Sequence, residues 1–316
     1  MDIKGKNFLI TGASGFIGAN LTRHFLKRGA NISILKRRQS NLWRIYDIKN
    51  RISIYNVDLL EYAKVKRVVN RIKPDVIFHT AAYGGHVSQG NLSRILKTNF
   101  IGTVNLLNCC SKIGFELFVN TGSSSEYGIK DHPMQESDIL TPITPYGVSK
   151  AAATIYCQYV ARRNDLPVIT LRLFSPYGYF DDGNRVISYV ILSCLKNSLP
   201  DISSPASVRD FIFIDDVMSS YEQALEKNGN MRGDIFNIGS GKQCSIINLV
   251  KKIVRAFGNN MTVGYKEDLC AGIESKHWVA DTSKSFKELG WKPKFNLDEG
   301  LKKTIKWFKD NNSFYS

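Results

Sequence analysis

The stretch N-F-L-I-T-G-A-S-G-F-I-G at 7–18 constrains the fold more than any other part of this chain. Its first half is an apolar run that predicts a short buried strand, and its second half carries Gly12, Gly15 and Gly18. The residues that follow repeat apolar side chains at helical spacing as far as Gly29, a residue type that often ends a helix. Because a strand, a glycine turn and a helix N-terminus together bind pyrophosphate, the stretch predicts a dinucleotide-binding unit. The spacing is T-G-x-x-G-x-x-G rather than G-x-G-x-x-G, and an ordinary glycine-rich turn is the alternative.

Strand and helix patterns alternate from this stretch to about residue 175. Such alternation predicts a Rossmann-type α/β fold, in which a doubly wound parallel sheet has right-handed crossovers. Beyond that point the alternation loosens, and we predict two domains. A dinucleotide-binding domain comprises 1–175 and about 209–240, and a smaller mixed α/β domain, which binds the substrate, comprises 176–208 and 241–316.

The second predicted strand, 32–35, is followed by three cations, Lys36, Arg37 and Arg38. In dinucleotide-binding folds this place often carries a carboxylate that binds the adenosine ribose hydroxyls of NAD. Cations instead suit the ribose 2′-phosphate of NADP, so NADP is the expected cofactor. A solvated basic turn is the alternative interpretation.

The formal net charge of +15 admits nucleic acid as a partner. The basic residues are scattered, however, and no nucleic-acid-binding motif occurs, so we expect a polyanionic small molecule such as a nucleotide diphosphate instead. No cysteines form a C-x-x-C pair, and no apolar run is long enough to span a membrane. We therefore expect reduced thiols in a cytoplasmic protein, without a metal site. The cysteines are Cys109, Cys110, Cys157, Cys194, Cys244 and Cys270.

Tyr146 and Lys150 stand four residues apart in Y-G-V-S-K, at the start of an apolar helical stretch, so they share one face of the predicted helix. A free tyrosine has a pKa of ~10, too high for efficient proton transfer at neutral pH. Because a nearby ammonium favours the phenolate, we expect Lys150 to lower the pKa of Tyr146. The serines at 123–125 strengthen this interpretation, since a hydroxyl there can bind a substrate carbonyl while Tyr146 transfers the proton.

Taken together, these residues resemble the extended short-chain dehydrogenases/reductases, in particular the nucleotide-sugar epimerase/dehydratase family. The resemblance covers nearly the whole chain and is much more specific for the family than for the reaction. The matching segments are T-G-A-S-G-F-I-G at 11–18, H-T-A-A at 79–82, S-S-S-E-Y-G at 123–128, Y-G-V-S-K at 146–150, L-R-L-F-S-P-Y-G at 171–178, R-D-F-I-F-I-D-D-V at 209–217 and G-W-K-P at 290–293.

The resemblance implies that Tyr146 donates or accepts the proton and that Lys150 assists it and binds the nicotinamide ribose. The matching catalytic serine is Ser123, with Ser124 as the neighbouring candidate. In the 4,6-dehydratases of this family, the two positions after the catalytic hydroxyl are Asp and Glu, which eliminate water. Here they are Ser124 and Ser125, which argues against dehydration.

The glycine stretch and the resemblance also imply the residues that bind the cofactor and the substrate. The expected cofactor-binding residues are Gly12, Ser14, Gly15, Phe16, Ile17, Gly18, Lys36, Arg37, Arg38, Asp58, Leu59, Ala81, Ala82, Tyr83, Asn99, Tyr146, Lys150 and Phe174. Arg209 matches the family's arginine that binds the diphosphate of the sugar nucleotide, and Ser175 replaces an asparagine. The other expected substrate contacts are His86, Ser125, Glu126 and Arg185, whereas His79, inside an apolar run, is interpreted as a core residue.

Two reactions within the family fit the sequence. A 4-ketoreductase uses NADPH and releases NADP, whereas a 4-epimerase keeps NAD bound. The basic run at 36–38 favours the reductase, as does A-A-Y-G-G-H at 81–86, which resembles nucleotide-linked 4-keto-6-deoxyhexose reductases, including those that make abequose-type sugars. We therefore predict NADPH-dependent reduction of a nucleotide-linked 4-keto sugar, with NAD-dependent 4-epimerization as the alternative.

A third hypothesis from another class is a non-catalytic NADP-sensing or RNA-associated module on the same fold. The serine, tyrosine and lysine set argues against it, because a sensor needs no proton transfer. The resemblance also implies a homodimer, with 99–110 and 151–160 as the candidate faces.

Overall fold

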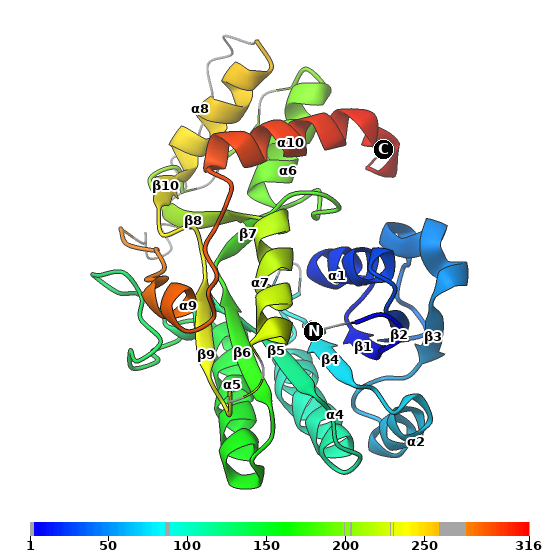
Figure 1. Cartoon of the computed structure of the whole chain (residues 1–316). Helices are drawn as coiled ribbons and strands as arrows, with labels where there is room; N and C mark the ends of the chain where they lie inside the picture. Colours follow the sequence, from blue (N-terminus) through cyan, green and yellow to red (C-terminus); the bar gives the residue numbers. More distant parts are fainter. Residues whose placement is uncertain are drawn as a thin grey trace.

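The computed structural model describes residues 3–85, 89–198, 200–202, 204–227, 229, 231–258 and 276–315. Its largest sheet has seven strands: β1 (Asn7–Thr11), β2 (Asn31–Lys36), β3 (Ser53–Asn56), β4 (Val76–His79), β5 (Leu117–Ser123), β6 (Val168–Leu173) and β9 (Ile235–Ile238). Their order is β3-β2-β1-β4-β5-β6-β9, and every neighbouring pair is parallel (Figure 1). The order reverses at β1, and ligands bind open α/β sheets at such a reversal. The predicted Rossmann-type fold is confirmed.

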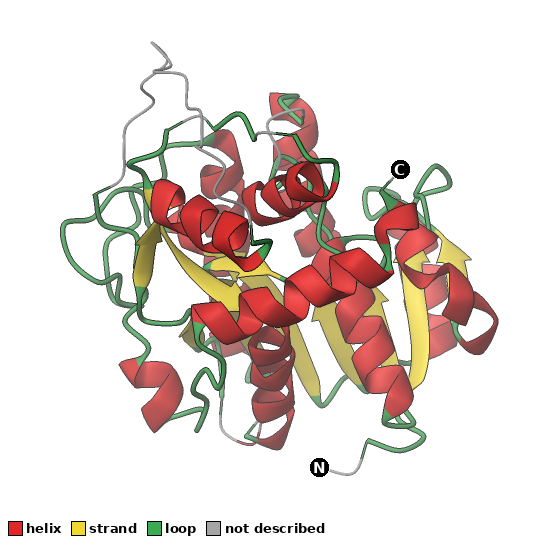
Figure 2. Cartoon of the chain, turned by 90° about the horizontal axis from the view of Figure 1, so that it is seen from above, coloured by secondary structure: helices red, strands yellow, loops and turns green. Residues whose placement is uncertain are grey.

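Helices cover both faces of this sheet, as the view in Figure 2 shows. They are α1 (Phe16–Lys27), η1 (Trp43–Arg51), α2 (Tyr62–Ile72), α3 (Leu92–Leu96), η2 (Lys97–Ile101), α4 (Gly102–Ser111), α5 (Pro145–Asn164) and α7 (Ile214–Glu226). Successive side chains of a strand point to opposite faces. Phe8 and Ile10 of β1 therefore pack in one core with α1 and α7, while Leu9 packs in the other core with α2, α4 and α5.

A second, mixed sheet follows directly along the chain, because its strand β7 starts two residues after β6 of the large sheet ends. Its strands are β7 (Ser175–Tyr177), β8 (Val208–Phe213) and β10 (Gln243–Ser245), in the order β10-β8-β7. Its surroundings include α6 (Val186–Leu195), α8 (Ile246–Ala256) and α10 (Leu297–Asp310), followed by η5 (Asn312–Phe314), whereas α9 (Ser283–Lys287) lies beside β9 of the large sheet. The prediction placed most of β8 in the dinucleotide-binding domain, but β8 pairs with this smaller sheet.

One apolar core connects the two sheets, since the same cluster contains Phe8 of β1 and Phe308 of α10. The division into two domains stays a prediction. In the described part of the chain, no helix is both long and apolar enough to cross a membrane. The same residues contain no group of three or more His, Cys, Asp or Glu side chains placed to hold a metal ion. Five cysteines are free thiols and four of these are buried, while Cys270 lies outside the described residues.

Candidate active site

The turn between β1 and α1 needs glycine at two positions. Gly12 has a φ of +71°, and a Cβ there would lie 2.6 Å from the backbone N of Ala81. A Cβ at Gly18 would overlap the carbonyl oxygen of Gly12. The residue that precedes α1 is Gly15, which has no side chain to cap the helix, so the first N–H groups remain available to an anion.

A cavity of about 190 Å³, which we call the adenosine cavity, opens beside this turn. Lys36 and Arg37 line it from the end of β2, and Asp58 lines it from the segment after β3. The ammonium of Lys36 donates to the carbonyl oxygens of Arg37 and Arg38 at 3.2 and 3.4 Å. No side-chain bond to another described residue engages the Arg37 guanidinium, which leaves this cation for a ligand, while Arg38 does not line the cavity. The other predicted residues in this lining are Gly12, Ser14, Gly15, Leu59, Ala81 and Ala82.

A second cavity of about 310 Å³, the central cavity, adjoins the first and shares the glycine turn with it. Tyr146 and Lys150 line it from the first turns of α5. The helix begins there because Thr144 accepts a hydrogen bond from the N–H of Gly147 at 3.0 Å and Pro145 occupies the first position. The other predicted residues in this lining are Gly12, Gly15, Phe16, Ile17, Gly18, Ala82, Ser123, Ser124, Ser125, Phe174, Ser175, Arg185 and Arg209.

Burial, rather than the neighbouring ammonium, dominates the ionisation of Tyr146. Burial raises the pKa of the phenol, the nearby Glu126 carboxylate raises it further, and a hydrogen bond with Ser123 lowers it. Burial likewise lowers the pKa of Lys150. The expectation that Lys150 lowers the pKa of Tyr146 is therefore wrong in this structure, because desolvation penalises both charged forms.

Ser123 and Ser124 have different partners at the end of β5. Ser123 Oγ accepts the N–H of Ser125 at 3.2 Å, as the cap of η3 (Ser124–Glu126), and its hydroxyl lowers the pKa of the nearby Tyr146 phenol. Ser124 Oγ accepts the indole N–H of Trp278 at 3.0 Å. The two serines therefore lie in one cavity but belong to separate hydrogen-bonded pairs.

Glu126 does not reach the central cavity, so its predicted contact with the substrate is corrected. The side chain is fully buried and pairs with Arg172 of β6, with 2.8 Å between Oε2 and Nε. Its other oxygen accepts the N–H of Ser123 at 2.8 Å. Since Ser124–Glu126 forms a helical turn rather than a continuing strand, the Glu126 side chain points back toward Ser123 and holds its backbone in place.

Asn99 and Tyr83, both predicted to bind the cofactor, do not line the cavities either. Asn99 is 1% exposed, and its amide oxygen accepts the N–H of Tyr83 at 2.8 Å. Its amide nitrogen donates to the carbonyl oxygen of Tyr83 and to Ser149 Oγ, both at 2.8 Å. Asn99 therefore fixes the segment after β4 against the residue that precedes Lys150, which is a structural role.

Two arginines lie where the central cavity meets a third cavity of about 970 Å³, the outer cavity. The Nε of Arg185 lies 3.2 Å from an oxygen of Asp181, and its Nη2 donates to the carbonyl of Pro176 at 3.0 Å. Arg209 Nη1 donates to the carbonyl of Val208 at 2.6 Å. Ser175 also borders both cavities, as predicted for a substrate contact. His86 lies outside the described residues.

Sequence reasoning missed Trp278, which lines the central cavity and carries the Arg209 guanidinium 4.9 Å from its ring centroid. Trp278 lies outside the segments that match the family, so the sequence did not indicate that it belongs to the site. His79 is a core residue as interpreted: it is 1% exposed, between Thr11 at 2.7 Å and Thr103 at 2.8 Å. Among the described residues that line the central cavity there is no Asp, Glu or His.

Comparison with known proteins identifies the family of this chain. Residues 8–239 match the NAD dependent epimerase/dehydratase family. The chain belongs to this family. It is 29% identical to a dTDP-4-dehydro-6-deoxyglucose reductase of Escherichia coli, over 97% of this chain and 98% of that protein.

Solved epimerases of the same family share the fold. A UDP-glucose 4-epimerase of Thermotoga maritima, solved with UDP-glucose, has a TM-score of 0.88 and 27% identity and covers 97% of this chain and 99% of its own. A UDP-glucuronic acid 4-epimerase of Bacillus cereus, solved with UDP-glucuronic acid and NAD, has a TM-score of 0.85 and 26% identity, covering 96% and 99%. The proteins similar to this chain therefore include a reductase, 4,6-dehydratases and 4-epimerases.

Proposed function

We propose that the protein reduces the C4 ketone of a nucleotide-linked 4-keto-6-deoxy sugar with NADPH. The observation that carries this proposal is the basic end of β2, where Lys36 and Arg37 line the adenosine cavity and no carboxylate follows the strand. A cation there suits the 2′-phosphate of NADP. The likeness to the E. coli reductase supports the same reaction.

The residues around the adenosine and central cavities fit a dinucleotide. A Cβ at Gly12 would close the turn, and Gly15 leaves the start of α1 uncapped for a pyrophosphate. In this proposal Arg37 binds the 2′-phosphate, Asp58 the adenine edge and Lys150 the nicotinamide ribose. NADPH, when bound, supplies the hydride that is added to C4.

Tyr146 is the proposed proton donor to the C4 oxygen. Because burial raises the pKa of its phenol, the proton stays on Tyr146 at neutral pH until the developing alkoxide accepts it. Ser123 holds the C4 oxygen beside the phenol, and the Lys150 ammonium stabilises the phenolate that remains. Arg185 and Arg209, between the central and outer cavities, bind the diphosphate with their planar donor groups.

Dehydration fits this site poorly. Eliminating water from a sugar needs an acid and a base besides the tyrosine. Ser124 and Ser125 occupy the positions where the 4,6-dehydratases carry Asp and Glu, and no carboxylate is among the described residues lining the central cavity.

The second candidate is an NAD-dependent 4-epimerase, which the structural likeness to two UDP-sugar 4-epimerases favours. An epimerase must first remove a proton from the C4 hydroxyl, so its tyrosine acts first as a base. Lys36 and Arg37 line the adenosine cavity and suit NADP rather than NAD, and this supports the reductase.

Turnover of NADPH tests the proposal. The protein is mixed with NADPH and a panel of UDP-, dTDP-, CDP- and GDP-linked 4-keto-6-deoxy sugars, and absorbance of the reduced nicotinamide is followed. We expect oxidation with at least one sugar and a Y146F variant with kcat lowered by about 10²- to 10⁴-fold at unchanged affinity for NADPH.

The control is Y159F on the same helix, because Tyr159 is 55% exposed and should leave kcat unchanged. Interconversion of C4 epimers of a nucleotide hexose without added cofactor, together with no NADPH oxidation by any sugar of the panel, would show an epimerase instead.

A further inference from the structure

Trp278 contacts two residues that line the central cavity, Ser124 and Arg209. Its indole N–H donates to Ser124 Oγ at 3.0 Å, and the Arg209 guanidinium lies over its ring. Ser124 and Trp278 are 5% and 8% exposed, yet both line the cavity that contains Tyr146. One side chain therefore connects a hydroxyl that lines the central cavity with Arg209, which lines both the central and the outer cavity.

The indole fixes the direction of the hydrogen bond at Ser124. An indole N–H can donate but not accept, so Ser124 Oγ is the acceptor and its own hydrogen remains to be donated. The structure gives this hydroxyl no acceptor in the described part of the chain. Ser123 Oγ also accepts an N–H, from Ser125, but its hydroxyl lies near the Tyr146 phenol, whose pKa it lowers. A buried hydroxyl that lines a cavity with a hydrogen to donate is suited to bind a ligand oxygen.

Hydrogen bonds of its own backbone hold the segment that carries Trp278 in place. The N–H of Trp278 donates to the side chain of Gln243 at 3.0 Å. Met134 pairs with Ala280 in an isolated parallel bridge, with Met134 N donating to the Val279 oxygen at 2.8 Å.

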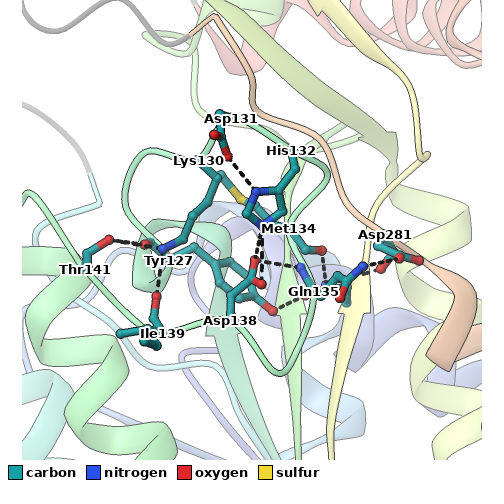
Figure 3. Close-up of polar contacts among 11 residues, drawn as sticks. Tyr127, Lys130, Asp131, His132, Met134, Gln135, Asp138, Ile139, Thr141 and Asp281 are labelled. Carbon is teal, nitrogen blue, oxygen red and sulfur yellow. Dashed lines mark hydrogen bonds and ion pairs between the residues drawn. The ribbon is translucent and has the colours of Figure 1, made fainter.

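Met134 belongs to a loop, 130–141, whose side chains are joined by hydrogen bonds and ion pairs. Figure 3 shows Lys130 bonded to Ile139 and Thr141, His132 between Asp131 and Asp138, and Gln135 directed to Asp281. Gln135 Nε2 lies 3.3 Å from the Asp281 carboxylate, just beyond the bridge. This loop places the indole before any substrate is bound.

We propose that Trp278 is a positioning residue that makes Ser124 a hydrogen-bond donor to an oxygen of the sugar other than the C4 oxygen held by Ser123 and Tyr146. The inference rests on the nucleotide-sugar substrate of the proposed function, but not on the direction of the reaction. Ser124 stands where the 4,6-dehydratases have an acid, so the position recognises the sugar here without titrating. By supporting Arg209 as well, Trp278 sets the distance between the sugar and diphosphate contacts.

Binding of nucleotide sugars by S124A and W278F tests the inference. Titration calorimetry on the full chain with NADP present compares UDP-glucose with UDP, and dTDP-glucose with dTDP. The loss of one neutral hydrogen bond should weaken binding of the nucleotide sugar about threefold to tenfold in each variant and leave binding of the nucleoside diphosphate unchanged. Phe keeps an aromatic ring for the Arg209 guanidinium but lacks the N–H and the second ring of the indole, so S124A, which keeps the whole indole, is the cleaner removal of the Ser124 hydroxyl.

The double variant shows whether Trp278 acts through Ser124. If it does, S124A/W278F binds the nucleotide sugar as weakly as S124A and no more weakly. Additive losses, equal losses for the sugar and the nucleoside diphosphate, or no loss would each overturn the inference.

The control is W291F, since Trp291 is also buried and donates to Ser219 at 2.9 Å but does not line the central cavity. It should lower the melting temperature and leave the sugar-to-nucleotide affinity ratio unchanged. If wild-type protein binds neither these sugars nor CDP-glucose or GDP-glucose, the substrate class and this inference are both wrong. If it binds them but oxidises no NADPH with a keto sugar, the reductase alone is wrong.

Discussion

Arg37 and Arg38 are adjacent cations in the sequence, but the fold gives them different surroundings. Arg37 lines the adenosine cavity, whereas Arg38 does not and contributes its backbone carbonyl to the ammonium of Lys36. A charge contributes to cofactor choice when it faces the phosphate at short range, because solvent screens more distant charges. Arg37 is therefore the residue on which a preference for NADP depends.

We expect R37D to lower kcat/KM for NADPH by about 10- to 100-fold, because a charge-assisted hydrogen bond to the 2′-phosphate is lost and repulsion replaces it. kcat/KM for NADH should change little. R38D makes the same change of charge one residue away and serves as the control. Steady-state kinetics with both cofactors give the ratio of kcat/KM for NADPH to kcat/KM for NADH. An equal ratio for R37D and the wild type would remove the argument for NADP.

At this scale the sequence predicted which residues line the cavities better than it predicted their ionisation. Tyr146, Lys150 and Ser123 come together as expected because their spacing and motif contain that information. The pKa of Tyr146 depends on how deeply the phenol is buried and on the charge of Glu126, which comes near the phenol because Ser124–Glu126 forms a helical turn. Neither burial nor that turn can be read from four-residue spacing.

Among the elements, the connection between β7 and α6 holds Arg185 through a buried carboxyl. Asp181 is 1% exposed, and burial raises its pKa from 3.8 to about 6, despite Arg185 nearby. Because the folded protein has the higher pKa, Asp181 stabilises it fully below about pH 4, and this contribution is lost as the pH rises through about 6. Above that pH the ionised carboxyl costs the folded state roughly 3 kcal/mol.

D181N should therefore raise the free energy of unfolding by roughly 2–3 kcal/mol at about pH 8 and by much less at about pH 4. Asn keeps an oxygen that can accept the N–H of Asp182, now bonded at 2.8 Å. Urea denaturation at the two pH values measures the difference, with D182N as the control for removing a neighbouring charge. An equal effect of D181N at both pH values would show that burial of Asp181 does not govern this part of the stability.

Element boundaries were predictable where local pattern sets them and not where distant contacts do. The stretch 62–72 is amphipathic at helical spacing, and the helix α2 has the same bounds. The candidate dimer face 99–110 is part of a longer helical path, α3, η2 and α4, which widens to a π-helix around Asn99. Asn99 bonds to Tyr83 and Ser149, and these partners are 16 and 50 residues away in the chain.

For the whole molecule, the glycine stretch at 7–18 and the strand–helix alternation that follows it were enough to predict a doubly wound parallel sheet. The C-terminal part was less predictable, since β8 joins the small sheet and Trp278 returns to the central cavity through contacts that no motif encodes. The homodimer stays a prediction. Exposed apolar side chains on its candidate faces include Ile101, Ile155 and Tyr159.

Transfer of deuterium from the cofactor tests the central claim, that a nucleotide-linked 4-keto sugar is reduced at C4 beside Tyr146. The protein is incubated with NADPH that carries deuterium at the transferable position and with the keto sugar that it turns over, and the product is examined by NMR. We expect one deuterium at C4 of the sugar for each NADPH oxidised, and none with Y146F over the same time. Product formed without deuterium from added NADPH would contradict the reductase and indicate a hydride that never leaves the protein.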